Sequence, residues 1–192
     1  MDKAIEFNEL SLSGAYAIRN FCHYDNRGDF IKSYDKEIYE EAGITVNINE
    51  TFVSVSSRNV LRGLHFQLRD PQAKLVCVLK GKAWDVIVDL RKSSPTYKKW
   101  ISVELGSEGK NAVYIPRGFA HGFVSLADET TMMYQCDGPY DKETDTGILY
   151  NDPVIGIKWP VDITNCIFSE RDLNLMSFEE FERKALEYGT YR

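Results

Sequence analysis

The chain has 192 residues, of which 43% are hydrophobic and 27% are charged, and its formal net charge is -6. This length suits one well-buried core, so we expect a single domain over residues 1–192. The acidic balance argues against a nucleic-acid-binding protein, which usually carries an excess of basic residues. The N-terminus lacks the basic start and apolar stretch of a signal peptide, and no segment approaches the roughly 18 apolar residues that span a membrane, so we expect a cytoplasmic protein without nucleic-acid or membrane partners.

The first third of the chain offers one short helix and two strand-like runs. The stretch DKEIYEEAG, residues 35–43, predicts two helical turns that end at Gly43. The run TFVSVSSRNV, residues 51–60, predicts a strand of strong β-propensity that would risk exposure without a partner. The next stretch places Arg62 and His65 three residues apart in an otherwise strand-like run.

The middle of the chain predicts β-structure almost without interruption. The run KLVCVL is followed by KGK and then AWDVIVDL, and because Gly81 can adopt a positive φ we expect a hairpin at this point. In the second run alternate residues fall on two faces, which are Trp84, Val86, Val88 and Leu90 on one and Asp85, Ile87 and Asp89 on the other. Further short runs follow at regular spacing, WISVEL, NAVYIP, GFVSL and TTMMYQC, and this spacing indicates a sandwich or a barrel.

The C-terminal stretch MSFEEFERKALEY predicts a helix. It has a capping box formed by Ser177 and Glu180 and a hydrophobic staple between Met176 and Phe181. Its apolar positions have helical spacing, which favours packing against the barrel. The sequence therefore predicts an all-β domain with short flanking helices and a C-terminal helix.

The cysteines and histidines do not have the spacing of a metal site. Cys22, Cys77, Cys136 and Cys166 are too irregular for a zinc knuckle or a compact disulfide framework, so we expect reduced thiols. The three histidines, at positions 23, 65 and 121, also lack a compact ligand spacing, so we expect no metal and no other cofactor. The chain contains no G-x-S-x-G elbow, P-loop or G-x-G-x-x-G motif.

A set of polar residues interrupts the β-rich stretches. Strands of a small barrel point alternate side chains inward, so these groups could converge on one cavity. Taken alone, several have ordinary structural explanations, such as a strand-end lysine that reaches water. The set consists of Arg62, His65, Gln67, Lys74, His121, Tyr134 and Asp172.

Several long motifs in the right order resemble the dTDP-4-dehydrorhamnose 3,5-epimerase family. They are NRGDF, VLRGLHFQ, AKLVCVLKGKAWDVIVDLRKSSPT, YIPRGFAHGF, YNDPVIGIKWP and SERD. The resemblance implies a jelly-roll (double-stranded β-helix, cupin-like) fold without a metal. It also implies a homodimer with exchanged N-terminal strands, and epimerisation of a nucleotide-linked 4-keto-6-deoxy sugar.

The resemblance also implies roles for individual residues. His65 matches the catalytic base, Asp172 the carboxylate that orients it, and Tyr134 the proton donor on the opposite face of the sugar. Lys74, Arg62 and His121 match residues that contact the 4-keto oxygen region, the diphosphate and the pocket, Arg27 matches an arginine of the nucleotide site, and we place Gln67 with the substrate-binding residues. These roles suit the chemistry, because a histidine with a pKa of about 6.5 can accept a proton near neutral pH and a lysine can stabilise charge that develops on a keto oxygen.

Four residues depart from the family pattern where the family contacts the nucleotide base. His23 stands where phenylalanine is usual, Lys32 where glutamate is usual, and Glu50 and Phe52 replace glutamine and asparagine. These changes alter hydrogen-bonding character, and a site rejects a ligand most sharply when buried polar groups are left unpaired. We therefore expect that, among dTDP-, CDP- and GDP-linked sugars, the thymidine nucleotide is not preferred; neutral drift is the alternative explanation.

Two other functions stay open from the sequence. One is a non-catalytic jelly-roll module that binds a glycan or a nucleotide sugar, and the other is a related 3,4-ketoisomerase. The presence of a base, its orienting carboxylate and an opposing acid favours an epimerase. Inversion at C3, at C5 or at both carbons is compatible with the same residues.

Overall fold

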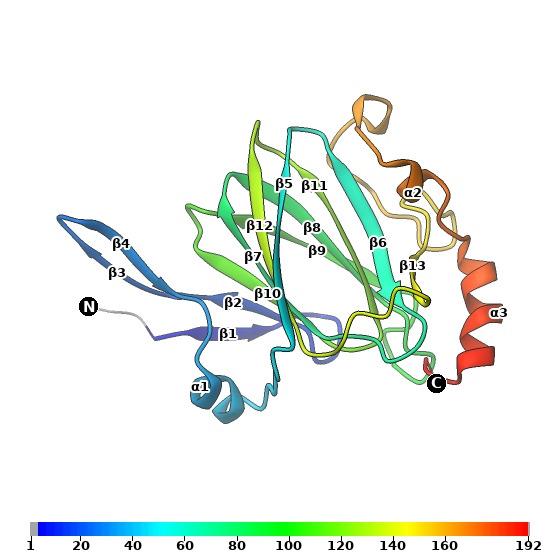
Figure 1. Ribbon diagram of the computed structural model, residues 1–192, viewed down its shortest axis with the longest axis horizontal. Coiled ribbons are helices and arrows are strands. Elements are labelled where there is room, and N and C mark those ends of the chain that lie inside the picture. The colour runs from blue at the N-terminus through cyan, green and yellow to red at the C-terminus, as the bar shows by residue number, and fades with distance from the viewer. Residues whose placement is uncertain (1–3, 192) are drawn as a thin grey trace.

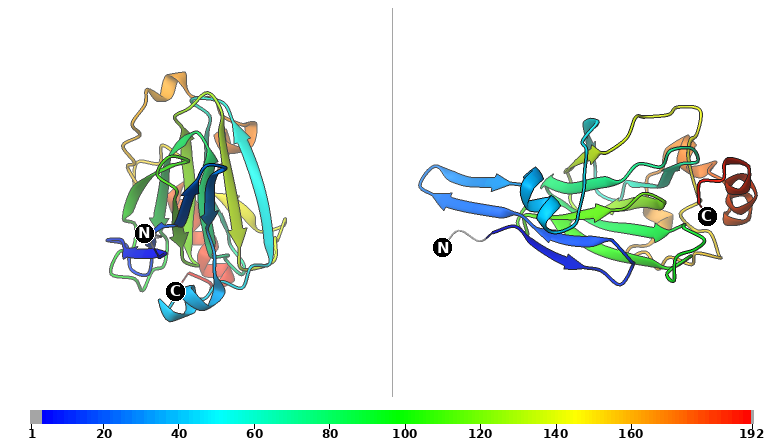
Figure 2. Two further views of the ribbon diagram at one scale, coloured as in Figure 1. Left: turned by 90° about the vertical axis from the view of Figure 1, so that its left-hand side faces the viewer. Right: turned by 90° about the horizontal axis from the view of Figure 1, so that it is seen from below.

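The computed structural model describes residues 4–191 and contains two large β-sheets that face each other (Figure 1, Figure 2). The six-stranded sheet has the order β1-β2-β10-β7-β12-β5, and the five-stranded sheet has the order β13-β6-β11-β8-β9. A separate two-stranded sheet pairs β3 with β4. The predicted all-β jelly-roll architecture is confirmed.

The strands are short, as the regular spacing of the β-rich runs predicts. Their bounds are β1 (Glu6–Glu9), β2 (Tyr16–Arg19), β3 (Phe21–Asp25), β4 (Gly28–Lys32), β5 (Glu50–Ser56), β6 (Leu61–Gln67), β7 (Lys74–Lys80), β8 (Lys82–Asp89), β9 (Trp100–Gly106), β10 (Asn111–Ile115), β11 (Phe119–Ser125), β12 (Thr130–Cys136) and β13 (Asp145–Gly147). All pairs within the sheets are antiparallel.

The main core lies between the two sheets, and a second apolar layer covers the outer face of the five-stranded sheet. β8 contributes to both layers. Its Ile87 packs in the inner core, while Val86 and Val88 point outward into the layer that contains Phe178 and Phe181 of the C-terminal helix. The predicted alternation of faces along β8 is therefore confirmed, and both faces are buried.

The hairpin predicted at Gly81 is wrong. β7 pairs with β10 and β12, whereas β8 pairs with β9 and β11, so the chain passes from one sheet to the other at this glycine. Gly81 does adopt the expected positive φ, of 80°. A Cβ there would lie 2.2 Å from the Glu129 carbonyl oxygen, so a close backbone approach as well as the turn requires glycine.

The run 51–60 is not one continuous strand. β5 ends at Ser56, and the chain turns through Asn59, whose φ is 65°, before β6 begins at Leu61. β5 lies at the edge of the six-stranded sheet, where its Val53 and Val55 are exposed.

The helices lie at the margins of the sheets. They are α1 (Lys36–Glu41), a 3-10 turn η1 (Ile163–Asn165), α2 (Glu170–Leu173) and α3 (Phe178–Tyr188). Ser177 caps α3 by accepting a hydrogen bond from the Glu180 backbone N–H, which agrees with the predicted start of this helix. Gly43 follows α1 with a φ of 78°, so the predicted end of that helix is confirmed as well.

The β3–β4 hairpin projects away from the two large sheets (Figure 1). It is connected to the β9–β10 turn by Lys110, whose ammonium pairs with Asp29 and lies 4.3 Å from the centre of the Tyr24 ring. The tip of the hairpin is exposed.

The described residues, 4–191, include every cysteine of the chain. All four cysteines are free thiols, and Cys77 and Cys136 are buried. None of the helices in this range is long and apolar enough to cross a membrane.

Candidate active site

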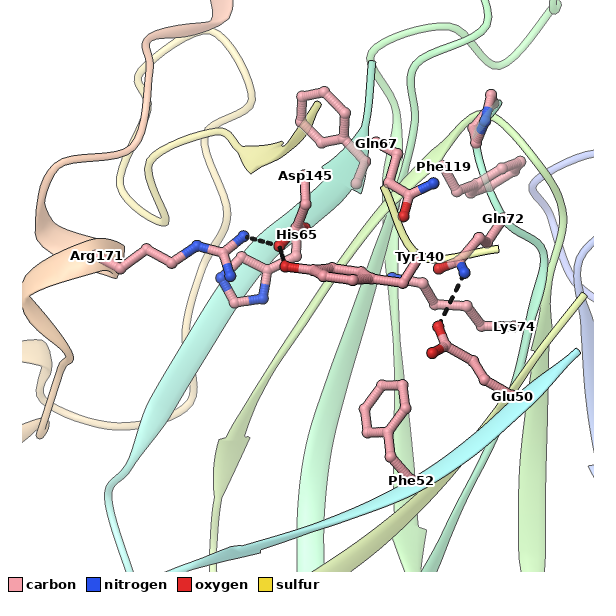
Figure 3. A pocket seen from close by; sticks show the side chains of 12 residues that line it. Glu50, Phe52, His65, Gln67, Gln72, Lys74, Phe119, Tyr140, Asp145 and Arg171 are labelled. Atoms are coloured by element: carbon pink, nitrogen blue, oxygen red, sulfur yellow. Dashed lines mark hydrogen bonds and ion pairs between the residues drawn. The ribbon is translucent and has the colours of Figure 1, made fainter. Parts of the chain in front are cut away.

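A cavity of about 420 Å³ opens between the two large sheets. Figure 3 shows its walls, which come from strands of both sheets, from the loops after β6 and β12, and from α2. The lining residues are Glu50, Phe52, His65, Phe66, Gln67, Pro71, Gln72, Lys74, Phe119, Tyr140, Asp145 and Arg171.

His65 and Asp172 form a tight pair at one side of this cavity. The Nε2 atom of His65 lies 2.6 Å from Oδ1 of Asp172, whose other oxygen accepts a hydrogen bond of 2.6 Å from the Ser169 hydroxyl. Burial acts to raise the pKa of Asp172, but the hydrogen bonds from His65 and Ser169 outweigh it and bring this pKa to about 2. The carboxylate is therefore ionised near neutral pH and fixes the orientation of the imidazole.

The His65 ring is placed to act as a base. The His65 side chain is 27% exposed and lines the cavity, whereas the Asp172 side chain is only 3% exposed. Burial lowers the pKa of His65, and the bond to Asp172 acts in the opposite direction. A lowered pKa keeps the imidazole unprotonated near neutral pH, which is the form that can accept a proton.

A β-bulge explains how Arg62 and His65 share one face of β6 although they are three residues apart. Across the sheet, His65 lies opposite His121 and Arg62 lies opposite Phe123, so three steps on β6 match two steps on β11. In a regular strand, residues at this spacing would point to opposite faces. Arg62 points inward and donates from Nε to the Ser56 hydroxyl of the facing sheet, at 3.1 Å.

The bulge depends on glycine at position 63. Gly63 has a φ of 114°, and a Cβ there would lie 2.5 Å from the Cα atom of Gly122. The two strands can therefore approach this closely only without a side chain.

Lys74 enters the cavity from the facing sheet, at the first position of β7. Burial lowers its pKa, while the nearby Asp145 and Glu50 carboxylates act in the opposite direction. A lysine in this environment can donate a hydrogen bond, or supply a positive charge, to an oxygen that becomes anionic.

Tyr134 also comes from the six-stranded sheet, on β12, and is buried beside the cavity. One face of its ring is stacked on Phe52, with 4.7 Å between the ring centres, and His121 contacts it at 5.9 Å from the other sheet. Burial raises the pKa of Tyr134, so the phenol keeps its proton. The predicted acid and the predicted base thus belong to opposite sheets.

His121 is part of a second buried histidine–aspartate pair. Its Nε2 atom lies 2.7 Å from Oδ2 of Asp85, and both side chains are buried. The sequence places Asp85 only on a strand face, because nothing along the chain connects it with a histidine 36 residues later.

Gln67 and Glu50 line the cavity but also have structural partners. Gln67 donates to the backbone oxygens of Asp70 and Pro139 and accepts from the Asp141 N–H, so its amide joins two loops. Glu50 accepts a hydrogen bond of 3.0 Å from Gln72. Their roles in substrate binding remain predictions.

The structure does not bring His23, Arg27 and Lys32 to the cavity of the same chain. All three lie on the β3–β4 hairpin, where His23 and Arg27 face Asp25 and Lys32 pairs with Asp35 at 3.1 Å. A separate hollow on this hairpin includes His23 and Arg27.

The sequence reasoning missed a chain of polar residues on the cavity wall. Asp145 lies 2.9 Å from Arg171 and accepts a hydrogen bond of 3.0 Å from the Tyr140 hydroxyl (Figure 3). Arg171 directly precedes Asp172 in the SERD motif, which was the one available signal. Tyr140 and Asp145 come from a polar loop and its end, where such residues look ordinary.

The described residues 4–191 contain no cluster of three or more His, Cys, Asp or Glu side chains that could hold a metal ion. The arrangement instead offers a histidine base with its carboxylate on one sheet, and a lysine and a protonated tyrosine on the other. Such a site can remove a proton from a carbon next to a carbonyl group and return one from the opposite side.

Comparison with known proteins gives a consistent result over nearly the whole chain. A family model described as dTDP-4-dehydrorhamnose 3,5-epimerase matches residues 9–180. The dTDP-4-dehydrorhamnose 3,5-epimerase of Methanothermobacter thermautotrophicus is 44% identical over 175 residues, which are 91% of this chain and 95% of that protein.

Two solved structures are similar in fold as well as in sequence. The dTDP-6-deoxy-D-glucose-3,5-epimerase of Legionella pneumophila, in complex with dTDP-4-keto-L-rhamnose, has a TM-score of 0.90 and 34% identity, covering 95% of this chain and 97% of that one. A 3'-monoepimerase of Streptomyces bikiniensis, in complex with dTDP-quinovose, has a TM-score of 0.84 and 34% identity, covering 93% of this chain and 90% of that one.

Proposed function

The chain belongs to the dTDP-4-dehydrorhamnose 3,5-epimerase family, and we propose that its cavity inverts C3, C5 or both carbons of a nucleotide-linked 4-keto-6-deoxy sugar. The protein is an isomerase that acts on nucleotide sugars. The observation that carries the assignment of roles is the placement of the His65–Asp172 pair on one wall of the cavity and of Lys74 and Tyr134 on the opposing sheet.

The first step is removal of a proton next to the ketone. His65 takes the proton from the carbon, and the electron pair of the broken C–H bond moves toward the keto oxygen to form an enolate. Asp172, at 2.6 Å, stabilises the imidazolium that results and holds the ring in one orientation.

The charge on the enolate oxygen needs a partner during this step. Lys74 is the cation that enters the cavity from the facing sheet, and we assign it to this oxygen. A positioned cation in a site shielded from water stabilises a developing oxyanion more than it would in bulk water.

Inversion then requires a proton from the other side of the sugar ring. Tyr134 donates its phenolic proton to the carbon as the enolate collapses back to the ketone. Solvent restores the proton of Tyr134 and removes the one held by His65, so the reaction is balanced without an oxidant, a reductant or a cofactor.

The diphosphate of the substrate needs local positive charge, because the protein is acidic overall, with a net charge of -6. Arg62 shares the inward face of β6 with His65, and the β-bulge lies between the two residues. A guanidinium can bind phosphate oxygens in a bidentate manner, so we place the diphosphate at Arg62 and the sugar at His65.

We further propose that two copies of the chain form a homodimer. The edge strand β5 exposes Val53 and Val55, and the projecting hairpin exposes Tyr24 and Phe30. An apolar edge strand that lacks a partner favours association with another chain. In such a dimer the β3–β4 hairpin could bring Arg27, together with His23 and Lys32, to the cavity of the partner copy.

The residues expected to contact the nucleotide base are those that depart from the family pattern. Glu50 is a hydrogen-bond acceptor where the pattern has an amide, and Phe52 offers a ring where the pattern has asparagine. We therefore propose that dTDP is not the preferred nucleotide among dTDP, CDP and GDP. The cytoplasmic location remains a prediction from the sequence.

The proposed function is tested by incubating the protein with dTDP-, CDP- and GDP-linked 4-keto-6-deoxy sugars in deuterium oxide and following the products by proton NMR. Epimerisation predicts solvent deuterium at each inverted carbon. Binding without deuterium incorporation would indicate a binding module, and movement of the carbonyl from C4 to C3 would indicate a ketoisomerase.

A further inference from the structure

Phe52 lines the cavity directly beside Tyr134. The two residues lie opposite each other on β5 and β12, and their rings are stacked with 13° between the planes and 4.7 Å between the centres. Phe52 lines the cavity and is 46% exposed, whereas Tyr134 is 7% exposed. One face of the tyrosine ring is therefore covered by the phenylalanine ring.

Tyr134 also contacts His121 and Met132. The imidazole of His121 meets it at 68° with 5.9 Å between ring centres, and His121 is itself held by Asp85. The tyrosine hydroxyl lies 3.8 Å from the Met132 sulfur, which is a weak hydrogen-bond acceptor. Packing against Phe52 and His121 thus holds the tyrosine ring in place.

We propose that Phe52 is a positioning residue that keeps the Tyr134 hydroxyl in place and shielded from water, and that it thereby determines how often the enolate is protonated on the face opposite His65. This inference rests on the proposed function, in which Tyr134 is the acid. It adds a role for a residue that departs from the family pattern and whose ring stacks on the acid.

The role follows from a competition between two proton donors. After proton removal, the enolate can regain a proton from the protonated His65, which restores the substrate, or from Tyr134, which inverts the carbon. In deuterium oxide the first route exchanges hydrogen for deuterium without inversion. A change that disturbs only Tyr134 therefore lowers inversion and leaves exchange, whereas a change that disturbs the base lowers both.

The electrostatic surroundings support the same role. Burial raises the pKa of Tyr134, and the Ser54 hydroxyl acts in the opposite direction. The charged and titratable groups around the ring are Asp85, Arg62, Cys136 and His121. Removing the Phe52 ring would admit water to one face of Tyr134, which would move its pKa back toward the ordinary value of 10.

The test compares wild-type protein with Phe52→Tyr, Phe52→Leu, Phe52→Asn and Tyr134→Phe. Exchange and inversion of the same substrate are followed by proton NMR in deuterium oxide over a range of pH. Tyr188→Leu is the matched control, because Tyr188 is an aromatic residue on α3, is 42% exposed and does not line the cavity. Circular dichroism and thermal melting confirm that each variant is folded.

Because Phe52 also lines the cavity, the variants are compared at saturating substrate, where we expect Phe52→Leu and Phe52→Asn to lower the ratio of inversion to exchange about tenfold. A tenfold change corresponds to about 1.4 kcal/mol, which is the size of an aromatic pair interaction. Phe52→Tyr keeps the stacked ring and should retain the wild-type ratio of inversion to exchange. In Phe52→Asn, the alkaline limb of the inversion profile should also move to lower pH, because Tyr134 no longer acts as an acid above its pKa.

The outcomes separate this inference from the proposed function. Equal losses of exchange and inversion in Phe52→Leu, or inversion that is unchanged in both Phe52→Leu and Phe52→Asn, would overturn the role of Phe52. Wild-type protein that neither exchanges nor inverts any of the three nucleotide sugars would overturn the proposed function instead. Full inversion by Tyr134→Phe would overturn the assignment of Tyr134, on which the role of Phe52 depends.

Discussion

Replacement of Asp172 by asparagine tests whether the carboxylate behind His65 supports the base. In the native protein the pKa of Asp172 falls from an ordinary 3.8 to about 2. At 1.36 kcal/mol per pKa unit, its surroundings favour the ionised carboxylate by about 2.5 kcal/mol. Ser169 and the Gly63 N–H share this effect with His65, so we assign about 1–2 kcal/mol to the His65 contact, which corresponds to a rate loss of about 5- to 30-fold.

The pH dependence of Asp172→Asn provides a second and independent test of the contact between Asp172 and His65. Burial lowers the pKa of His65 and Asp172 acts to raise it, so removal of the carboxylate should lower the pKa of His65 further. The base is active when unprotonated, so the acidic limb of the inversion profile should move to lower pH while the plateau falls, because a weaker base accepts the proton less readily.

The assay follows deuterium exchange and inversion against pH, with Asp162→Asn as the control. Asp162 caps the η1 turn at an exposed position and does not line the cavity. An unchanged plateau in Asp172→Asn, or an acidic limb that moves to higher pH, would refute the reasoning.

Three further outcomes are expected. Dialysis against EDTA should leave inversion unchanged, because the spacing of the histidines and cysteines offers no metal shell; activity that is lost and then restored by one equivalent of a transition metal would contradict this. Sedimentation at micromolar concentration should show a dimer. Val55→Lys should weaken this dimer, whereas the control Leu186→Lys, at an exposed apolar position on α3, should not. A wild-type monomer would argue against the exposed edge of β5 as an interface. Calorimetry should show that dTDP is not the tightest of dTDP, CDP and GDP, and tightest binding of dTDP would favour neutral drift at His23, Lys32, Glu50 and Phe52.

The β-rich centre of the chain could be predicted from the sequence because each strand carries its own alternation. β12 coincides with the run TTMMYQC, and the two faces of β8 enter two different apolar layers as expected. The connection at Gly81 could not be predicted in the same way. A glycine with positive φ suits both a hairpin and a passage between facing sheets, and only the pairing of β7 and β8 with other strands distinguishes the two.

The N-terminal strands were less visible. β1 and β4 have mostly exposed side chains, so their sequences, EFNE and GDFIK, carry little hydrophobic periodicity. The existence of the β3–β4 hairpin, and with it the position of His23, Arg27 and Lys32, was therefore not apparent from the pattern of residues.

The site was partly visible from polar residues that interrupt apolar strands. Lys74 and His65 could be singled out in this way, and the structure places both on the cavity wall. Asp172 also belongs to the polar set, but only the family resemblance predicts its role beside His65, because the contact between them spans 107 positions. The Asp145–Arg171–Tyr140 contacts were missed, because polar residues in loops give no sign of which of them meet in space.

The division of proton transfer between two faces of the sugar is the central claim, and one NMR experiment in deuterium oxide tests it most directly. Tyr134→Phe removes the acid and leaves His65, Asp172 and Lys74 in place, so it should lose inversion and still exchange the substrate's proton with solvent. His65→Ala should lose both exchange and inversion by a factor on the order of a hundred or more. Equal loss of exchange in the two variants, or full inversion by Tyr134→Phe, would contradict the claim.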